Sequence, residues 1–431
     1  MPVNRRKLAG LLLGLLITAA AAGTAAASHS GTPGVSKHQI VIGGTFPYTG
    51  PAALYKTIPS AEQAYYAYVN AKFGGVHHRK IKDITLDDQY NPGETPGLVK
   101  KLVEKNHVMA VVGSLGTAPS LATWGYLNKR HIPQVLLATG DAYWGNCVHR
   151  KCPAAGATTP RPWTIGWQPD YPGESKLYGK YILAHKKNAK IGVLYQNDAY
   201  GKNYLNGLKN GLGTHKDEIV DAEPYNVTDS AQVVGSHVVK IASSGADVFV
   251  IFATPSAAIA ALATEGQIPG FNPLTINNNV SANRLFMEIA AQNGAKPNGV
   301  ISTTYVSSQT AQPNLAGMKL AKSIIHKYAP GGVGSLDQQF ASGDGNLVYG
   351  LAVGWTFVDA LRHAGKNPTR ASLMHALRHL NEKHNPFIFP RMVVKTSKHR
   401  TFPMEQLIFI KWAGGAGGDW KTQGGVVFSG H

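Results

Sequence analysis

The sequence predicts an α/β fold, in which parallel strands form sheets that helices cover on both faces. Short apolar runs alternate with longer segments of apolar periodicity along most of the chain, as strands and helices do in such folds. An irregular, proline-rich stretch over 147–161 interrupts this pattern, which begins again near residue 173. Because 431 residues exceed one typical core, the two successive halves are expected to form two domains.

A secretory leader is expected to precede the fold. The basic stretch 4–7 is followed by an apolar core over 8–17 and small residues at 25–27, so 1–27 is interpreted as a signal peptide. The alternative is an uncleaved membrane anchor, for which this apolar core is short. No cysteine stands at the cleavage point, which argues against a lipid anchor. We therefore expect an exported protein, in the periplasm or at the cell surface.

The first half is expected to contain strands that alternate with helices. Its expected strands are 39–45, 81–88, 108–113 and 133–139, and its expected helices are 59–70, 96–105 and 121–129. The turns after the strands, at 45–51, 113–120 and 139–142, should open on the carboxyl edge of a parallel sheet. Ligands bind at that edge in such sheets.

The second half repeats the alternation without repeating the sequence. Its expected strands are 191–195, 218–225, 247–252, 274–277 and 300–305, and its expected helices are 173–185, a segment ending at 212, 232–243 and 255–265. Further helices are expected over 316–328, 346–364 and 370–380. The segment 163–167 is interpreted as a crossing strand, and 393–412 as strand, turn and strand.

The stretch 109–121 is the strongest candidate for a binding turn. An apolar run ends at Gly113, small and hydroxyl residues follow, and Pro119 lies near the start of a helix. Unpaired N–H groups and the positive end of the helix dipole would favour a carboxylate or a phosphate there. The alternative is an ordinary strand-to-helix turn.

The two cysteines of the chain, Cys147 and Cys152, are expected to form a disulfide. Export provides an oxidising compartment in which such a pair closes a small loop. A metal-binding pair is the alternative, but no second cysteine pair completes a tetrahedral site.

The remaining composition points away from nucleic acid, metals and catalysis. The net charge of +18 is interpreted as a dispersed surface property, with contact to anionic lipid or cell-wall polymer as the alternative. Nucleic-acid motifs are missing, and export argues against that partner. His375 and His379 lie four residues apart on an expected helix, but without a third ligand they indicate a solvated face. Since we find no nucleophile elbow, zinc-protease helix or phosphate loop, we expect neither an enzyme nor a cofactor.

A set of stretches in a fixed order resembles a known family. They are 40–50, 111–120, 134–142 with Trp144, 163–168 with Tyr171, 197–201 and 252–256. In this order and spacing they resemble the periplasmic-type (type I) solute-binding proteins of ABC importers, and in particular the branched-chain amino-acid-binding group. The resemblance covers nearly the whole mature chain.

The resemblance implies two α/β lobes that are joined by three crossing segments and close around a ligand. The first lobe would comprise 36–162 plus 305–386, and the second 163–304 plus 387–431. The crossings would then fall near Trp163, Tyr305 and Phe387.

The resemblance also implies the positions of ligand-binding residues. In the family the ligand carboxylate meets a hydroxyl and backbone N–H groups, and an aromatic residue faces it from the second lobe. The expected ligand-binding residues of this chain are Thr117, Ala118, Thr139, Gly140, Asp141, Tyr200, Thr254, Asn278, Asn279 and Tyr48. Aromatic side chains that would line the cleft are Tyr48, Tyr55, Trp144 and Tyr200.

One position departs from the family. The acidic partner of a ligand ammonium is expected after the strand 274–277, where this chain has Asn278 and Asn279. An amide accepts a hydrogen bond but does not neutralise an ammonium group. Either Asp141 or Asp198 replaces the missing acid, or the ligand is not an α-amino acid.

These observations favour a monomeric binding protein that delivers a small carboxylate-bearing solute to the permease of an ABC importer. A module that presents its ligand to a membrane receptor is the second interpretation. An exported enzyme is the third, because a fold alone does not fix function; the lack of a catalytic constellation argues against it.

Overall fold

The computed structural model describes residues 31–331 and 335–430, and from Thr32 onward these belong to one compact unit. The predicted signal peptide, 1–27, lies outside the described residues. Within the described ranges, no helix is both long enough and apolar enough to cross a membrane.

The first sheet confirms the predicted parallel arrangement. Over the described residues it is five-stranded, in the order β2-β1-β3-β4-β5, and all its pairings are parallel. Its strands are β1 (Gln39–Phe46), β2 (Lys80–Asp87), β3 (Val111–Val112), β4 (Gln134–Leu137) and β5 (Thr164–Gly166). The intervening helices are α1 (Thr57–Phe73), α2 (Thr95–Lys100) with a π-helical turn (Lys101–Lys105), and α3 (Thr117–Lys129).

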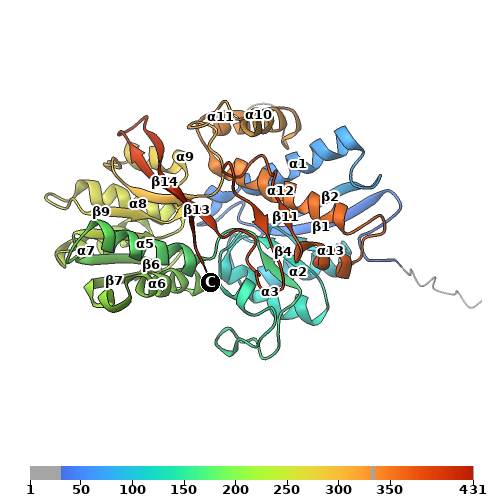
Figure 1. Ribbon diagram of the computed structural model, residues 1–431, viewed down its shortest axis with the longest axis horizontal. Helices are drawn as coiled ribbons and strands as arrows, with labels where there is room; N and C mark the ends of the chain where they lie inside the picture. Colours follow the sequence, from blue (N-terminus) through green and yellow to red (C-terminus); the bar gives the residue numbers. More distant parts are fainter. Residues whose placement is uncertain (1–30, 332–334, 431) are drawn as a thin grey trace, which may run out of the picture. The chain divides into compact units, whose positions relative to one another are not determined.

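The second sheet is mixed. In the described part of the chain it is seven-stranded, in the order β14-β13-β10-β9-β8-β6-β7, and it is parallel from β10 to β7. Its parallel strands are β6 (Ile191–Gln196), β7 (Ile219–Tyr225), β8 (Val248–Phe252), β9 (Leu274–Asn277) and β10 (Ile301–Thr304). Its helices are α5 (Tyr171–His185), α6 (Ala199–Leu212), α7 (Ala231–Ser243), α8 (Pro255–Gln267) and α9 (Arg284–Gln292). We call each sheet with its helices a lobe (Figure 1).

Helices that follow β10 return to the first lobe. They are α10 (Ala316–Tyr328), α11 (Ser335–Ala341), α12 (Gly345–His363) and α13 (Arg370–Leu377). α12 packs along α1, where Phe357 lies edge-on to Tyr66 at a ring-centroid distance of 5.9 Å. α12 is almost entirely buried, which explains why its sequence is apolar around the whole helix.

The C-terminal segment differs from its prediction. The expected strand, turn and strand over 393–412 are present as β12 (Val394–Lys395) and β13 (Gln406–Ala413), but these two strands do not pair with each other. β13 forms a hairpin with β14 (Asp419–Phe428), joined by a glycine-rich turn. β13 also pairs antiparallel with β10, whereas residues 394–395 form only a short bridge with 381–382. β14 was missed because it is largely exposed and polar and therefore shows no apolar run. The helices α9 and α11 were also not predicted.

Sheet and core membership locate the chain crossings. The first crossing from one lobe to the other was predicted at Trp163. However, Thr164–Gly166 still pairs with β4 in the first sheet. The third was predicted at Phe387, yet Phe387, Met392 and Met404 all pack in the core of the first lobe. By these pairings the chain leaves the first lobe after β5 and again before β13.

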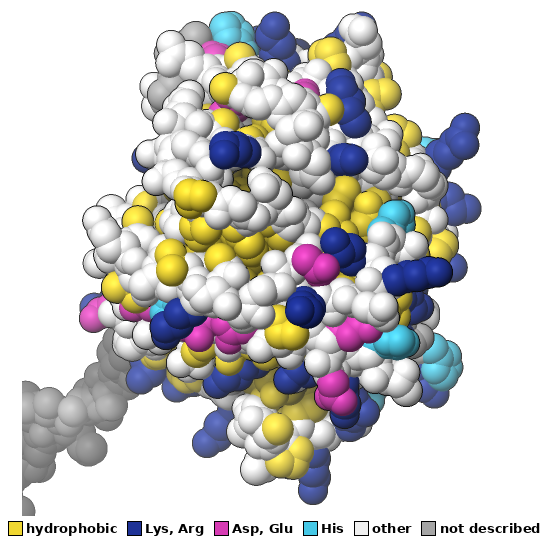
Figure 2. Space-filling view, turned by 90° about the vertical axis from the view of Figure 1, so that its left-hand side faces the viewer, with side chains coloured by type: hydrophobic (Ala, Val, Ile, Leu, Met, Phe, Trp, Pro, Cys, Tyr) yellow, Lys and Arg dark blue, Asp and Glu magenta, His cyan; other side chains and the backbone are white. Residues whose placement is uncertain are grey.

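The disulfide between Cys147 and Cys152 is present, which confirms its prediction. It lies next to the short helix α4 (Tyr143–Asn146), and Cys147 is buried with Trp124 and Trp144. Lysine and arginine side chains are scattered over the face shown in Figure 2 rather than gathered in one patch. This distribution agrees with a dispersed surface charge.

Candidate ligand-binding site

A cavity of about 260 Å³ lies between the two lobes. Its wall includes residues that follow strands of both sheets: Tyr90 after β2, Gly116 after β3, Tyr171 after β5, Tyr200 after β6 and Asn279 after β9. The carboxyl edges of both parallel sheets therefore meet at this cavity, as expected for ligand sites in such sheets.

Aromatic side chains make up much of the lining. They are Tyr55, Tyr90, Tyr171, Tyr200, Tyr305, Tyr349, Phe389 and Trp420. Most are buried and carry a polar atom at one end, so they offer apolar area together with hydrogen-bonding groups. Such a lining is typical of small-molecule sites.

The turn after β3 contributes backbone rather than hydroxyl groups to this wall. Gly116 precedes α3 with a φ of 100°, and a Cβ there would lie 2.6 Å from the Tyr90 ring, so glycine is required. Thr117 and Thr139 are both buried, and their hydroxyl oxygens are 2.6 Å apart. Tyr171 also donates to the Thr139 hydroxyl at 3.3 Å. These hydroxyls thus form a hydrogen-bonded layer, and neither threonine is a lining residue.

The other residues expected in the first lobe lie near the cavity but do not line it. The carbonyl oxygen of Gly140 accepts from the Tyr171 backbone N–H at 2.7 Å. Asp141 is fully buried, and burial together with the charge of Asp198 raises the pKa of its carboxyl to about 7. Ala118 is likewise outside the lining.

In the second lobe, Tyr200, Thr254 and Asn279 line the cavity. The Tyr200 hydroxyl is hydrogen-bonded to the Asn278 amide, so Asn278 fixes Tyr200 from outside the lining. Thr254 shares a hydrogen bond of 3.1 Å with the Tyr225 hydroxyl.

Asn279 is held by a buried acid. Its backbone N–H donates to Glu174 at 2.8 Å, and the hydroxyls of Tyr178 and Tyr204 donate to the same carboxyl group. Burial raises the pKa of Glu174 to about 7. Glu174 does not line the cavity.

Two of the aromatic side chains expected in the cleft lie elsewhere. The Tyr48 hydroxyl is hydrogen-bonded to Thr85 at 2.7 Å, away from the lining residues. Trp144 packs edge-on against Trp124 beside the disulfide. Tyr55 and Tyr200, by contrast, do line the cavity. The roles of Tyr48 and of the non-lining residues in ligand binding stay predictions.

The charged side chains that line the cavity are basic. Among the described lining residues none is aspartate or glutamate, and the charged ones are Arg284 and Lys421. Neither Asp141 nor Asp198, the candidates for an ammonium partner, is among them. Arg284 itself is paired with Glu288 at 3.5 Å and with Asp419 at 4.0 Å.

Several lining residues were not found from the sequence. Tyr305 directly follows β10, and Tyr90 and Tyr171 lie a few residues after β2 and β5. Their position at the carboxyl ends of parallel strands is a signal that could have found them. Tyr349 lies inside the buried helix α12, and Trp420 lies on the missed strand β14. Neither has a local sequence signal.

The two lobes contact one another around the cavity. Tyr55 donates to the carbonyl oxygen of Val280 at 3.2 Å, and Ser256 donates to that of Pro51 at 3.1 Å. Asn283, just before α9, donates to Asp344, just before α12, at 2.6 Å. These contacts join the two lobes at several points.

This arrangement, two α/β lobes with a cavity between them, defines a two-lobed binding protein. The family model described as "Periplasmic binding protein" matches residues 39–417. The chain belongs to this family, whose members are extracytoplasmic solute-binding proteins and not enzymes.

Individual relatives agree with this assignment. The chain is 23% identical over 297 residues to a Leu/Ile/Val-binding protein homolog 3 of Brucella melitensis, covering 68% of this chain and 73% of that protein. A branched-chain amino acid ABC transporter structure from Thermus thermophilus, with bound valine, has a TM-score of 0.77 at 15% identity, covering 91% and 97% of the two chains. A fatty acid ABC transporter substrate-binding protein from Thermomonospora curvata has a TM-score of 0.71 at 20% identity, covering 91% and 94%.

Proposed function

We propose that this protein captures a small carboxylate-bearing solute between its lobes and delivers it to the permease of an ABC importer. The observation that carries the proposal is the aromatic-lined cavity of about 260 Å³ at the carboxyl edges of both sheets. Fatty acids and valine, named with two of the similar structures, share a carboxylate, which supports this solute class.

In this proposal Tyr200, Thr254 and Asn279 contact the solute from the second lobe. Thr117 and Thr139, with Ala118 and Gly140, lie behind the wall formed by Gly116 and Ala138 and hold its shape. The protein acts as an exported monomer. Closure of the two lobes buries the solute, and the closed form presents both lobes to the permease.

A thermal-shift screen of the purified protein tests the proposal. The panel comprises amino acids, aromatic acids, fatty acids, short amides and dicarboxylates. A ligand that binds only the folded state stabilises it by about 2.7 kcal/mol at a hundred times its dissociation constant. We expect at least one carboxylate to raise the melting temperature clearly. A folded protein that no carboxylate stabilises would refute the solute class.

Measuring uptake of the solute in cells distinguishes a role in transport from a role in sensing. Deletion of the gene should abolish uptake of the labelled solute that the screen identifies, and the intact gene should restore it. Unchanged uptake together with a lost response to the solute would favour the receptor module instead.

A further inference from the structure

Tyr90, in the turn after β2, lines the cavity in a backbone conformation that residues other than glycine rarely adopt. Its φ is 59°, and that of the preceding Gln89 is 53°. Both values lie in the left-handed region, which is an outlier for a bulky aromatic residue and costs free energy. Strain of this kind persists where the surrounding structure fixes it, and it gathers at ligand sites. The strain therefore points to a function for the position of the Tyr90 ring.

The strained turn is fixed by Asp88, which is fully buried. Its Oδ1 accepts the backbone N–H of Tyr90 at 3.1 Å, and its Oδ2 accepts the hydroxyl of Thr95 at 3.0 Å. Its carbonyl oxygen also accepts the backbone N–H of Asn91 at 2.7 Å. Because both carboxylate oxygens are used between β2 and the start of α2, the turn holds Tyr90 in one place.

The ring of Tyr90 is seated against a second turn of the first lobe. A Cβ at Gly116 would lie 2.6 Å from this ring, and Gly116 itself has a φ of 100°. A side chain at Gly116 would therefore displace the ring. Two unusual backbone conformations, on the turns after β2 and β3, thus combine to place one buried ring in the cavity wall.

The hydroxyl of Tyr90 reaches the second lobe. Burial raises the pKa of Tyr90 well above its usual value, the charge of Asp198 raises it further, and a hydrogen bond with Gln196 opposes this shift. Gln196 ends β6, and its Nε2 donates to Oδ2 of Asp198 at 2.7 Å. Neither Gln196 nor Asp198 lines the cavity. The Tyr90 side chain therefore extends from one lobe to the other and separates the cavity from this polar pair.

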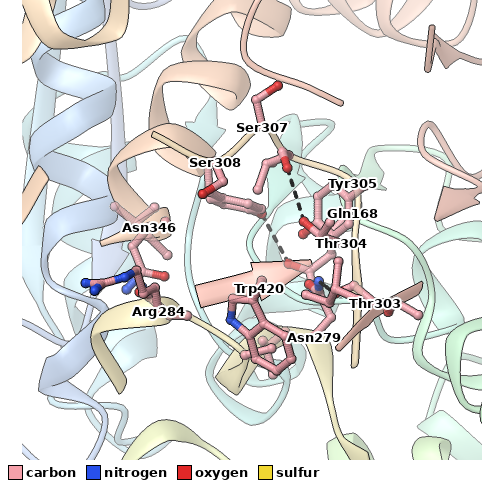
Figure 3. Close-up of a pocket in the computed structure, with 18 of the residues that line it drawn as sticks. Gln168, Asn279, Arg284, Thr303, Thr304, Tyr305, Ser307, Ser308, Asn346 and Trp420 are labelled. Atoms are coloured by element: carbon pink, nitrogen blue, oxygen red, sulfur yellow. Dashed lines mark hydrogen bonds between the residues drawn. The ribbon is translucent and has the colours of Figure 1, made fainter. Parts of the chain in front are cut away.

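The second-lobe wall of the cavity is fixed by contacts within that lobe. Nδ2 of Asn279 donates to the carbonyl oxygen of Thr303 at 2.5 Å, and the Trp420 ring lies edge-on to Trp412 at a centroid distance of 5.4 Å. Figure 3 shows Asn279 and Thr303 together, with the Trp420 ring in the same cavity. A solute held against this wall is limited on the first-lobe side by the wall that contains Tyr90.

We infer that Tyr90 determines the length of the solute that the cavity accepts. A solute that extends past the ring would displace the Tyr90 hydroxyl from Gln196 and hold the two lobes apart. A solute that ends at the ring leaves this contact intact. The inference rests on the proposed function and names a specificity-determining residue of the same cavity.

Calorimetric titration with unbranched alkanoates, from butanoate to decanoate, tests this inference. In the parent protein we expect the affinity to rise about four-fold per methylene group until the chain meets the ring, and to fall beyond that length. Tyr90→Ala should move this maximum to a chain about two carbons longer or more, because it removes the ring. Tyr90→Phe should keep the maximum and weaken binding at every length about two- to ten-fold, since it loses only the hydrogen bond with Gln196.

Two further variants complete the test. Tyr90→Gly also removes the ring, and glycine adopts a positive φ without strain, so this variant should fold and show the longer maximum even where Tyr90→Ala does not fold. Tyr126→Ala is the matched control, because Tyr126 lies on α3 outside the lining and its hydroxyl donates to Glu104 at 2.9 Å. The control should keep the maximum of the parent.

The inference is overturned if the variants without the ring keep the maximum of the parent protein, or if Tyr126→Ala shifts it equally. A parent protein that binds none of these alkanoates would overturn it as well. Stabilisation by another carboxylate in the thermal-shift screen would then leave the proposed function standing.

Discussion

Nδ2 of Asn203 donates a hydrogen bond to Oδ2 of Asp141 at 3.0 Å. Asp141 follows β4 in the first lobe, and Asn203 lies on α6 of the second, so this contact joins the lobes beside the cavity. Both partners are at least partly buried, and Asp141 also accepts from the Tyr143 backbone N–H at 2.8 Å. The contact requires the two lobes to lie against one another at this point.

Removal of this contact should favour the open conformation. Asn203→Ala should weaken solute binding by about two- to ten-fold, as expected for one hydrogen bond of roughly 0.5–1.5 kcal/mol. Small-angle scattering of the parent protein should show a smaller radius of gyration with solute than without it. Asn206→Ala, at an exposed position of the same helix, is the control and should leave both measurements unchanged. An unchanged scattering curve at saturation would contradict hinge closure.

Stability should fall as the pH rises through neutrality. The folded-state pKa values of Asp141 and Glu174 are raised to about 7, and that of Glu382 to about 8, in each case chiefly by burial. Between pH 4 and these values the folded protein therefore binds more protons than the unfolded chain. The free energy of unfolding then decreases as the pH rises across this window, on the order of 1.4 kcal/mol per unit of pKa shift for each group.

The variant Glu174→Gln isolates one of these groups. It should flatten the decrease in urea-unfolding free energy between about pH 5 and 8, because an amide does not titrate. Asp217→Asn, at an exposed position, is the control and should keep the slope of the parent. A slope that is the same in all three proteins would show that Glu174 is not protonated in the folded state.

The disulfide should stabilise the first lobe locally. Reduction of Cys147 and Cys152 opens a small loop beside the buried Trp124. A disulfide that closes a loop of this size contributes roughly 2 kcal/mol to the free energy of unfolding. Urea unfolding with and without reductant should show that difference. Mass spectrometry of the non-reduced, freshly exported protein should detect the linked peptides, and two alkylatable thiols would contradict the pairing.

Tyr200 should contribute packing area rather than a hydroxyl group. Its ring lies edge-on to Tyr171 at 5.0 Å and to Tyr204 at 5.4 Å, and its hydroxyl is already bonded to Asn278. Tyr200→Ala should therefore weaken solute binding about ten-fold or more, whereas Tyr200→Phe should weaken it only slightly. Calorimetry compares the two variants. Equal losses would assign the contribution to the hydroxyl instead.

The sequence was sufficient for the parts of the fold that depend on local pattern. The family resemblance directed attention to Tyr200 and Asn279, which line the cavity, and apolar runs identified β1, β6, β8 and β9. These predictions succeed because buried parallel strands require continuous apolar residues.

The rest of the site depends on contacts between distant segments. Thr117 was predicted to offer its hydroxyl to a ligand, but that hydroxyl lies against Thr139, which is on a different strand-to-helix turn. Trp420 reaches the cavity on β14, whose exposed positions leave no apolar pattern to read. Arg284 lies at the start of a helix that was not predicted. Such residues meet only through tertiary structure, and local periodicity does not specify them.

Isothermal titration with the best carboxylate from the thermal-shift screen measures whether the cavity binds this solute class. We expect saturable binding of one solute per chain, with a dissociation constant of about 1 μM or below, corresponding to about −8.2 kcal/mol. We also expect Tyr200→Ala to weaken this binding and the exposed Asn206→Ala to leave it unchanged. Binding that saturates equally in both variants would place the site outside the cavity, and the lack of saturable binding by any carboxylate would show that the protein does not capture this class of solute.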